Sequence, residues 1–202
     1  MKNTAMWCLR GLLAISSAAC AQAQQASATA TYAVQPIATA QDGNETLGRG
    51  ERLAKFGGCS DCHSPKVMTP QGPELDKSRL LSGHPARASL PAIPQGVVGP
   101  TRWGAVATND LTAWAGPWGV SFAANLTPDV TGLGGWTERQ FIQTMRTGKH
   151  LGVGRAILPP MPWPGVASLT DGDLKALFAY LQALKPISNS VPQPIAPDRS
   201  GH

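Results

Sequence analysis

The chain has 202 residues, enough for one medium-sized domain or for one small domain with long appendages. Charged residues make up only 14% of it, and 22 Gly with 18 Pro take an unusually large share, which argues against a long coiled coil or a bundle of helices alone. A hydrophobic fraction of 42% with six Trp argues against disorder throughout. The formal charge of +5 is not gathered into basic runs, so we expect no nucleic-acid partner.

The first 23 residues have the features of an export signal. Lys2 and Arg10 supply a positive start, an apolar stretch runs over residues 11–21, and Ala21-Gln22-Ala23 forms a small-x-small cleavage site. We therefore predict a signal peptide over residues 1–23. The mature protein is expected to be periplasmic and to have no membrane-spanning segment after cleavage.

Two other interpretations of this segment stay open. The apolar stretch could remain as an uncleaved anchor, although it is shorter than the ~20 residues that a membrane-spanning helix needs. A lipid could be attached at Cys20, although the branched apolar residue expected three positions earlier is missing. Cleavage after Ala23 would leave Cys59 and Cys62 as the cysteines of the exported chain.

The segment that follows contains a polar arm and then the first predicted helix. Residues 24–43 are rich in Ala, Gln and Thr without apolar periodicity, which indicates a flexible arm. A helix is predicted over residues 45–57, where Gly48 and Gly50 would let another helix approach closely. The pair Gly57-Gly58 is expected to end this helix.

The strongest motif of the chain is Cys59-Ser60-Asp61-Cys62-His63. The C-x-x-C-H spacing is typical of the attachment site of a c-type haem. Two thiols at this spacing can reach the two vinyl groups on one edge of the porphyrin and form two thioethers. The imidazole that follows can then lie under the ring and bind the iron. The motif therefore predicts one haem c, linked through Cys59 and Cys62 and bound by His63.

Other uses of a C-x-x-C-H motif are weaker interpretations here. A redox-active dithiol would favour a thioredoxin-like βαβ context, and the sequence shows no sign of one. A zinc site would need further ligands at metal spacing. The remaining histidines, His84, His150 and His202, are scattered along the chain.

Residues 64–120 interrupt the helical pattern. They contain eight Pro and seven Gly, so we expect a long wrapped loop with at most a short hairpin. Loops of this length are uncommon in compact domains. This one is either a structural excursion or a cover over a haem edge or a docking surface.

Two further helices are predicted in the second half of the chain. Thr137-Glu138-Arg139-Gln140 is a capping-box pattern, and Gly148 can end the helix that it starts. The last helix begins at Thr170 and ends before Pro186. Its apolar stripe at helical spacing consists of Leu174, Leu177, Phe178, Leu181 and Leu184.

The second iron ligand is expected at Met161, because Pro160 and Pro162 on either side make a stiff, extended strap. Such a strap holds a thioether in place at little entropic cost. Met68 follows the haem motif too closely to reach the other face, and Met145 fits core packing better. The alternatives that remain are His84, His150 or an open iron site.

Several stretches of the sequence together match the pattern of a known family. They are Arg49–Ala54 leading into Cys59–His63, Ala124–Asp129 with Thr131–Gly134 and Trp136, Pro160–Trp163, and Leu169–Pro192. On these residues the chain resembles a class I c-type cytochrome with one haem. It is most similar to the cytochrome subunits of bacterial alcohol and gluconate dehydrogenases.

This resemblance implies an all-α fold, a cytochrome c-like helical domain wrapped around one covalent haem. The domain would span residues 44–190, followed by an extended tail over 191–202, with the last helix crossing the first. His63 would be the proximal iron ligand and Met161 the distal one. A turn carbonyl, which we assign to Pro73, would accept a hydrogen bond from His63 Nδ1.

The aromatic and basic residues of the chain offer further contacts to the haem. The tryptophans that could shield the ring or donate to its propionates are Trp103, Trp118, Trp136 and Trp163, although plain core packing explains them equally well. Arg102 and Arg146 could pair with propionates, against a default of solvated surface positions.

We expect an electron carrier and not an enzyme. It would pass single electrons between redox proteins, from a periplasmic dehydrogenase to an oxidase or reductase, through an exposed haem edge. Two alternatives stay open. The chain could be a haem-containing subunit of a larger complex, or a haem sensor or enzyme that binds a small ligand after a labile distal ligand leaves.

Overall fold

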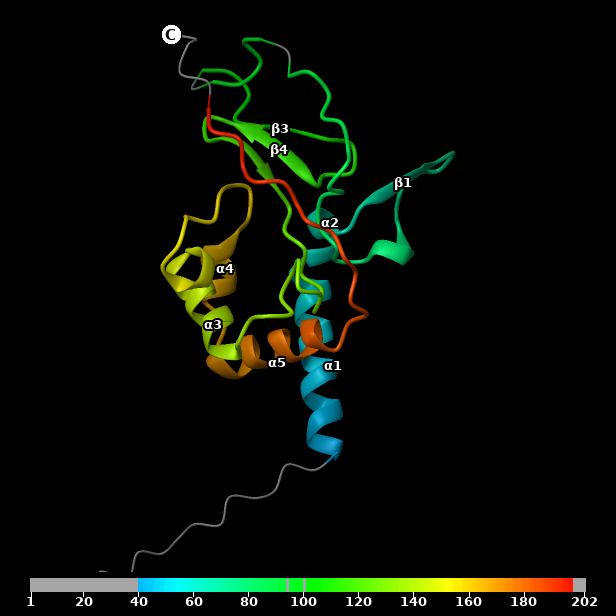
Figure 1. Ribbon diagram of the computed structural model, residues 1–202, viewed down its shortest axis with the longest axis vertical. Helices are drawn as coiled ribbons and strands as arrows, with labels where there is room; N and C mark the ends of the chain where they lie inside the picture. The colour runs from blue at the N-terminus through cyan, green and yellow to red at the C-terminus, as the bar shows by residue number, and fades with distance from the viewer. Residues whose placement is uncertain (1–39, 94, 100, 198–202) are drawn as a thin grey trace, which may run out of the picture. The chain divides into compact units, whose positions relative to one another are not determined.

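The computed structural model of the protein describes residues 40–93, 95–99 and 101–197, which all fall within one structural unit (Figure 1). The predicted signal peptide and the predicted arm up to residue 39 lie outside the described residues. The helices are α1 (Ala40–Phe56), α2 (Cys59–His63), α3 (Glu138–Thr147), α4 (Trp163–Ala167) and α5 (Asp171–Gln182), with the 3-10 turns η1 (Lys77–Arg79) and η2 (His150–Gly152). None of the described helices is both long enough and apolar enough to cross a membrane.

Helix α1 leads the chain to the C-x-x-C-H motif. It begins at Ala40, earlier than the predicted start at residue 45, and ends at Phe56 just before the glycine pair. Gly58 then adopts a left-handed conformation with φ of 63°, which costs a glycine little. This turn leads directly into α2, so the position of the motif depends on how α1 is held.

Helix α5 crosses α1 at close range, as predicted (Figure 1). A Cβ atom on Gly50 would collide with the carbonyl group of Ala176 and with the Cβ atom of Tyr180. Gly50 therefore allows the contact between the two backbones, as expected from the sequence. Gly48, which was expected to share this role, has only the side chain of Arg52 near its own Cβ direction.

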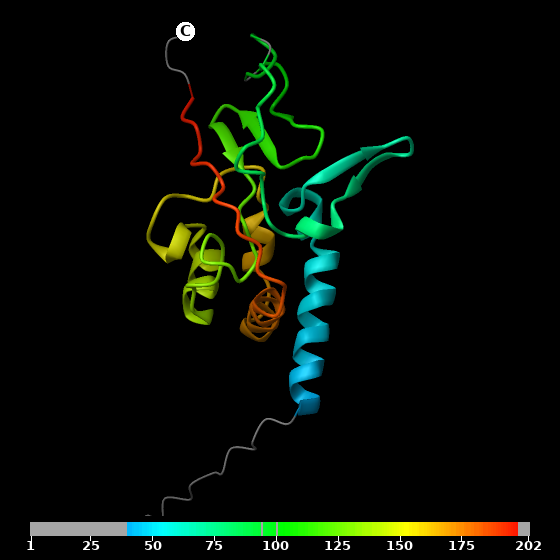
Figure 2. The same ribbon diagram turned by 45° about the vertical axis from the view of Figure 1, so that its right-hand side comes forward.

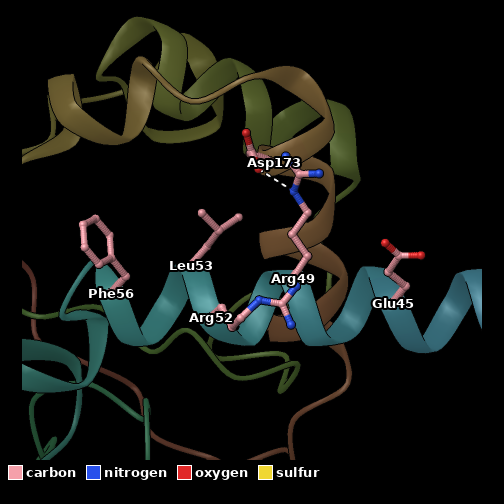
Figure 3. Close-up of a pocket in the computed structure, with 6 residues that line it drawn as sticks. All are labelled: Glu45, Arg49, Arg52, Leu53, Phe56 and Asp173. Carbon is pink, nitrogen blue, oxygen red and sulfur yellow. Dashed lines mark hydrogen bonds and ion pairs between the residues drawn. The ribbon is translucent and has the colours of Figure 1, made fainter.

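An ion pair joins the same two helices. Arg49 Nε lies 2.7 Å from Asp173 Oδ1, near the first turn of α5. The two residues line a surface pocket together with residues of α1, and Figure 3 shows Arg49 pointing toward Asp173. The hydrogen bond from Arg49 lowers the pKa of the Asp173 carboxyl below its ordinary value. The carboxylate is therefore more stable in the folded protein than in the unfolded chain.

Replacing Arg49 by Gln should lower the resistance of the protein to denaturant at neutral pH. Because the folded-state pKa of Asp173 is depressed, the stabilisation is present above the ordinary Asp pKa of about 4 and is lost as the pH falls through the folded-state value. The difference between the Arg49→Gln variant and the wild type should therefore vanish in acid. Urea unfolding midpoints of both proteins at a series of pH values would measure this, and a constant difference would contradict it.

Helices α3 and α5 form as their sequence signals predict. Thr137 and Gln140 make both hydrogen bonds of the capping box, and α3 ends at Gly148, whose φ is 64°. Thr170 caps α5 by accepting a hydrogen bond from the backbone of Asp173. The predicted stripe of α5 is buried, apart from a partly buried Leu184 at its end. The main core cluster consists of Ala54, Leu81, Leu133, Phe141, Leu174, Leu177, Phe178 and Leu181.

The predicted all-α class is wrong, because the segment expected to be a loop contains two antiparallel sheets. The first sheet is a hairpin that extends away from the helices in Figure 2, and the second has the order β3-β4-β5. The strands are β1 (Lys66–Thr69), β2 (Gly72–Leu75), β3 (Val106–Ala107), β4 (Ala113–Gly116) and β5 (Gly119–Phe122). At most one short hairpin was expected in this segment, and a three-stranded sheet forms there as well.

The C-terminal segment runs from α5 back to this second sheet (Figure 1). Val120 of β5 and Ile195 exchange both backbone hydrogen bonds, with N···O distances of 2.8 and 2.9 Å. Asn189, which is buried, donates to the carbonyl oxygens of Ser82 and His84 at 2.7 and 2.8 Å. The segment after α5 thus ties the second sheet and the chain around His84 to the helical part of the protein.

Candidate functional site

Helix α2 places the two thiols of the motif side by side. Cys59 and Cys62 are three residues apart, which is close to one helical turn, so their side chains lie on the same face. Both are free cysteines and both are half-buried. Burial raises the pKa of both thiols. A reactive dithiol requires the opposite shift, so these cysteines do not have the electrostatics of a redox-active pair.

The imidazole of His63 is held by one hydrogen bond. Its Nδ1–H donates to the carbonyl oxygen of Ala124 at 2.7 Å. Burial lowers the pKa of His63, and this hydrogen bond opposes the shift only in part. The ring is therefore neutral at neutral pH, with its Nε2 lone pair left available to a metal ion.

The assignment of the Pro73 carbonyl as the partner of His63 is wrong. Pro73 lies in β2, paired with Met68 in the projecting hairpin. The backbone of Gly83 donates to the His63 carbonyl oxygen at 2.8 Å, but the partner of the His63 ring comes after β5, where Ala123 and Ala124 follow the strand. The available signal was the Ala124–Asp129 stretch, already part of the family resemblance, but nothing local links it to a histidine 61 residues earlier.

The Ala124 carbonyl belongs to a well-tied turn. The side chain of Asn125 is buried, and its Oδ1 accepts hydrogen bonds from the backbone and hydroxyl of Thr127 at 3.0 and 2.8 Å. Its Nδ2 donates to the carbonyl oxygen of Ile187 at 2.8 Å. The turn that positions His63 is therefore fastened to the segment after α5, a connection that sequence reasoning missed.

Met161 lies between a turn at Pro159 and Pro160 and the start of α4, so the strap that was predicted to be extended is bent just before Met161. Its side chain is half-buried. The backbone N–H of Ile157 donates to the carbonyl oxygen of Gly148 at 2.8 Å, just before the strap. Just after it, the ring of Trp163 occupies the space where Gly148 would carry a Cβ atom. Both ends of the strap are therefore attached to the C-terminus of α3.

The other candidates for a second iron ligand, two methionines and two histidines, differ in how deeply they are buried. Met68 is 65% exposed on the projecting hairpin, and Met145 packs against the core, as expected for it. His84 is buried, and its Nδ1 lies 2.8 Å from Thr112 Oγ1, while its Nε2 has no partner among the described residues. His150 is exposed and meets the ring of Trp136 edge-on at 5.0 Å. The assignment of Met161 stays a prediction.

The tryptophans named as candidates for shielding a haem have varied surroundings. Trp103 is 72% exposed, while Trp136 packs against the core cluster. The rings of Trp118 and Trp163 lie against glycines, Gly116 and Gly148. These contacts account for three of the four as packing residues, and their roles toward a haem stay predictions.

The two candidate arginines already have partners within the protein. Arg146 Nη2 lies 2.5 Å from Asp171 Oδ1, and its Nη1 donates to the carbonyl oxygen of Ala167. Arg102 donates to the carbonyl oxygen of Gly96 and is exposed. Arg146 therefore fastens α3 to the start of α5.

Sequence comparison finds curated relatives that are named as cytochrome subunits of dehydrogenases. The chain is 28% identical over 162 residues, 79% of its length, to the gluconate 2-dehydrogenase cytochrome c subunit of Pantoea cypripedii. It is 28% identical over 154 residues, 75% of its length, to the cytochrome c subunit of the alcohol dehydrogenase (quinone) of Gluconobacter oxydans. It is 35% identical over 83 residues, 40% of its length, to the fructose dehydrogenase cytochrome subunit of Gluconobacter japonicus.

These comparisons confirm the resemblance that the motifs indicated: the chain is similar to the cytochrome c subunits of these dehydrogenases. No protein-family model matches the chain. The chain spans 28%, 24% and 17% of the lengths of the three relatives. The likeness therefore covers less than a third of each relative and does not extend to their activities.

Proposed function

We propose that the protein is a periplasmic electron carrier with one haem c. The haem would be linked through Cys59 and Cys62, with His63 and Met161 as its axial ligands. The protein would carry out no substrate chemistry of its own. The export-signal pattern of residues 1–23 supports the periplasmic location.

The observation that carries this proposal is the arrangement on α2. Two free, half-buried thiols one turn apart are followed directly by a neutral imidazole whose Nδ1–H is engaged and whose Nε2 is available. This donor set fits a covalently attached haem, because it offers two thioether-forming atoms and one nitrogen ligand. The iron of such a haem accepts and releases one electron at a time.

Each of the residues around the site would have its own role in binding the haem. The two cysteines hold the group even when the surrounding packing loosens. The carbonyl oxygen of Ala124 orients the His63 ring by accepting a hydrogen bond from Nδ1–H. This hydrogen bond makes Nε2 a stronger ligand. The Met161 thioether would raise the reduction potential relative to a second imidazole.

The partners we propose are redox proteins of the same compartment. The names of the relatives support a dehydrogenase as the electron donor, in a stable complex or in transient encounters. An oxidase or reductase would then be the acceptor. The charged residues of α1 are mixed in sign, and Arg49, Glu51 and Lys55 are in ion pairs within the protein, which gives no preference for a strongly acidic partner.

The test is a spectrum and a potentiometric titration of the purified holoprotein. We expect a low-spin ferric spectrum with the near-infrared band of a Met–Fe(III) bond, one redox transition of a single electron, and slow or absent CO binding to the reduced form. Rapid CO binding without prior unfolding would instead favour a haem sensor or enzyme with a displaceable distal ligand. A haem-free protein after expression with a haem-attachment system would contradict the proposal.

A further inference from the structure

We propose that Ser121 is a positioning residue for the distal ligand, so that the second sheet acts as a support for the Met161 strap. The inference rests on the proposed function, because it takes Met161 as an iron ligand. It also assigns a purpose to the long segment between the haem motif and the Ala124–Asp129 turn. That segment would brace the opposite side of the haem site instead of covering an edge of it.

The contact that suggests this role joins β5 to the strap. The hydroxyl of Ser121 donates to the carbonyl oxygen of Pro159 at 2.6 Å, across 38 residues of sequence. Ser121 is only 8% exposed while Pro159 is exposed, so the bond is half-buried. The indole Nε1–H of Trp118 donates to the same hydroxyl oxygen at 3.2 Å. The carbonyl oxygen of Trp114 lies 3.4 Å from this hydroxyl, so Pro159 at 2.6 Å is the nearer acceptor of its single proton.

The strap depends on this bond because it has few others. Pro159, Pro160 and Pro162 have no backbone N–H to donate. Among the described residues, no other hydrogen bond reaches the backbone of residues 158–161. The next attachment points are Ile157 on one side and Pro162 on the other, where the carbonyl oxygen of Pro162 accepts from the backbone of Gly165 at 3.0 Å. Ser121 therefore holds the middle of the strap, two residues before Met161.

The strand that carries Ser121 is itself held on both sides. On one side β5 pairs with β4, with Ser121 opposite Trp114. On the other side its neighbour Val120 exchanges two backbone hydrogen bonds with Ile195. A support that is paired on both edges moves less than a free loop, so the hydroxyl has a defined position to offer the strap.

The proposal predicts that Ser121→Ala weakens methionine ligation without removing the methionine. Added imidazole competes with Met161 for the ferric iron, so its affinity reports how firmly the strap holds the thioether. We expect imidazole to bind the Ser121→Ala holoprotein about tenfold more tightly than the wild type, the effect of losing one half-buried hydrogen bond. The near-infrared band should still be present without imidazole. Ser121→Thr keeps the hydroxyl and should retain wild-type affinity.

The matched control is Ser168→Ala. Ser168 also donates its hydroxyl to a backbone carbonyl, that of Gly165 at 2.7 Å, but it lies after the strap at the end of α4. Its replacement should leave imidazole affinity unchanged. Unfolding midpoints of all variants separate a local effect on ligation from general destabilisation, since a merely structural role would lower the midpoint and leave imidazole binding to the folded protein unchanged.

A second variant covers the case in which Ser121→Ala fails to take up haem. Trp118→Phe removes the N–H that donates to the Ser121 hydroxyl while leaving the strap and its carbonyl untouched. We expect a smaller increase in imidazole affinity from it, about threefold. If Ser121→Ala takes up haem, a wild-type imidazole affinity in this variant would overturn the inference. If it does not, Trp118→Phe is measured instead, and a wild-type imidazole affinity in Trp118→Phe would overturn it. Should Met161→Ala keep the near-infrared band, the ligand assignment itself would be wrong, and the role of Ser121 would fall with it.

Discussion

Replacement of Met161 by Ala should abolish the near-infrared band of the ferric holoprotein and lower its reduction potential. The thioether is the better ligand for the reduced iron, so its loss favours the oxidised state. Because axial ligands alone shift haem potentials over ~0.8 V, we expect a fall of roughly 0.1 V or more. The reduced variant should also bind CO rapidly, since one coordination position is open. Absorption spectra, potentiometric titration and CO mixing would measure the three effects.

Two other methionines of the chain serve as controls for this experiment. Met145 packs against the core and Met68 is exposed on the projecting hairpin. Met145→Leu should lower stability slightly and keep the band, and Met68→Leu should change neither. An unchanged spectrum in Met161→Ala would show that another residue binds the iron. His84, whose buried Nε2 has no partner among the described residues, would then be the next residue to replace.

The double replacement Cys59→Ser with Cys62→Ser should remove covalently bound haem completely. Serine hydroxyls do not add to the vinyl groups, so any haem held by His63 alone would dissociate when the protein is denatured. A haem stain of a denaturing gel would detect this, because the band of the wild-type chain keeps its haem and that of the double variant does not. Each single variant should keep one thioether and stain more weakly.

The sequence offers a matched control for the cysteine experiment as well. Cys8 and Cys20 lie in the predicted signal peptide. Replacing both by Ser should leave the haem stain unchanged, since the predicted cleavage after Ala23 would remove them from the mature chain. Covalent haem that persists in the Cys59→Ser, Cys62→Ser chain would contradict the attachment site, and a loss of stain in the Cys8→Ser, Cys20→Ser chain would point to export or lipid attachment through those residues.

Features that depend on neighbouring residues were predicted well. The capping box at Thr137, the Gly148 end of α3 and the buried stripe of α5 each involve residues within a few turns of one helix. Gly50 was recognised as a close-contact position because its lack of a Cβ atom has a local meaning that any crossing helix can use. The motif on α2 could also be recognised locally, since its two thiols are three residues apart, and the attachment of a haem to it stays a prediction.

The sheets escaped prediction because their strands carry weak local signals. Strand β4 reads Ala-Trp-Ala-Gly, so its buried positions are filled by small alanines instead of the branched residues that usually mark a strand. Strand β3 has only two residues. Such segments become strands through the partners they meet, and Val120 meets Ile195 from the far end of the chain. The high Gly and Pro content correctly indicated interruption of the helices, but it did not exclude short paired strands.

The sequence by itself indicated the candidate donor atoms: two thiols and an imidazole in one motif, and a thioether between two prolines whose role as an iron ligand stays a prediction. Tertiary structure alone decided which groups hold those donors. Ala124, not Pro73, accepts the proton of His63 Nδ1, and Ser121 meets the strap before Met161. The physical reason is that ligand chemistry resides in side chains and short spacings, whereas the atoms that orient a ligand come from distant backbone carbonyls. Every residue has a backbone carbonyl, so neither composition nor motifs indicate which carbonyl the fold will place beside a ligand.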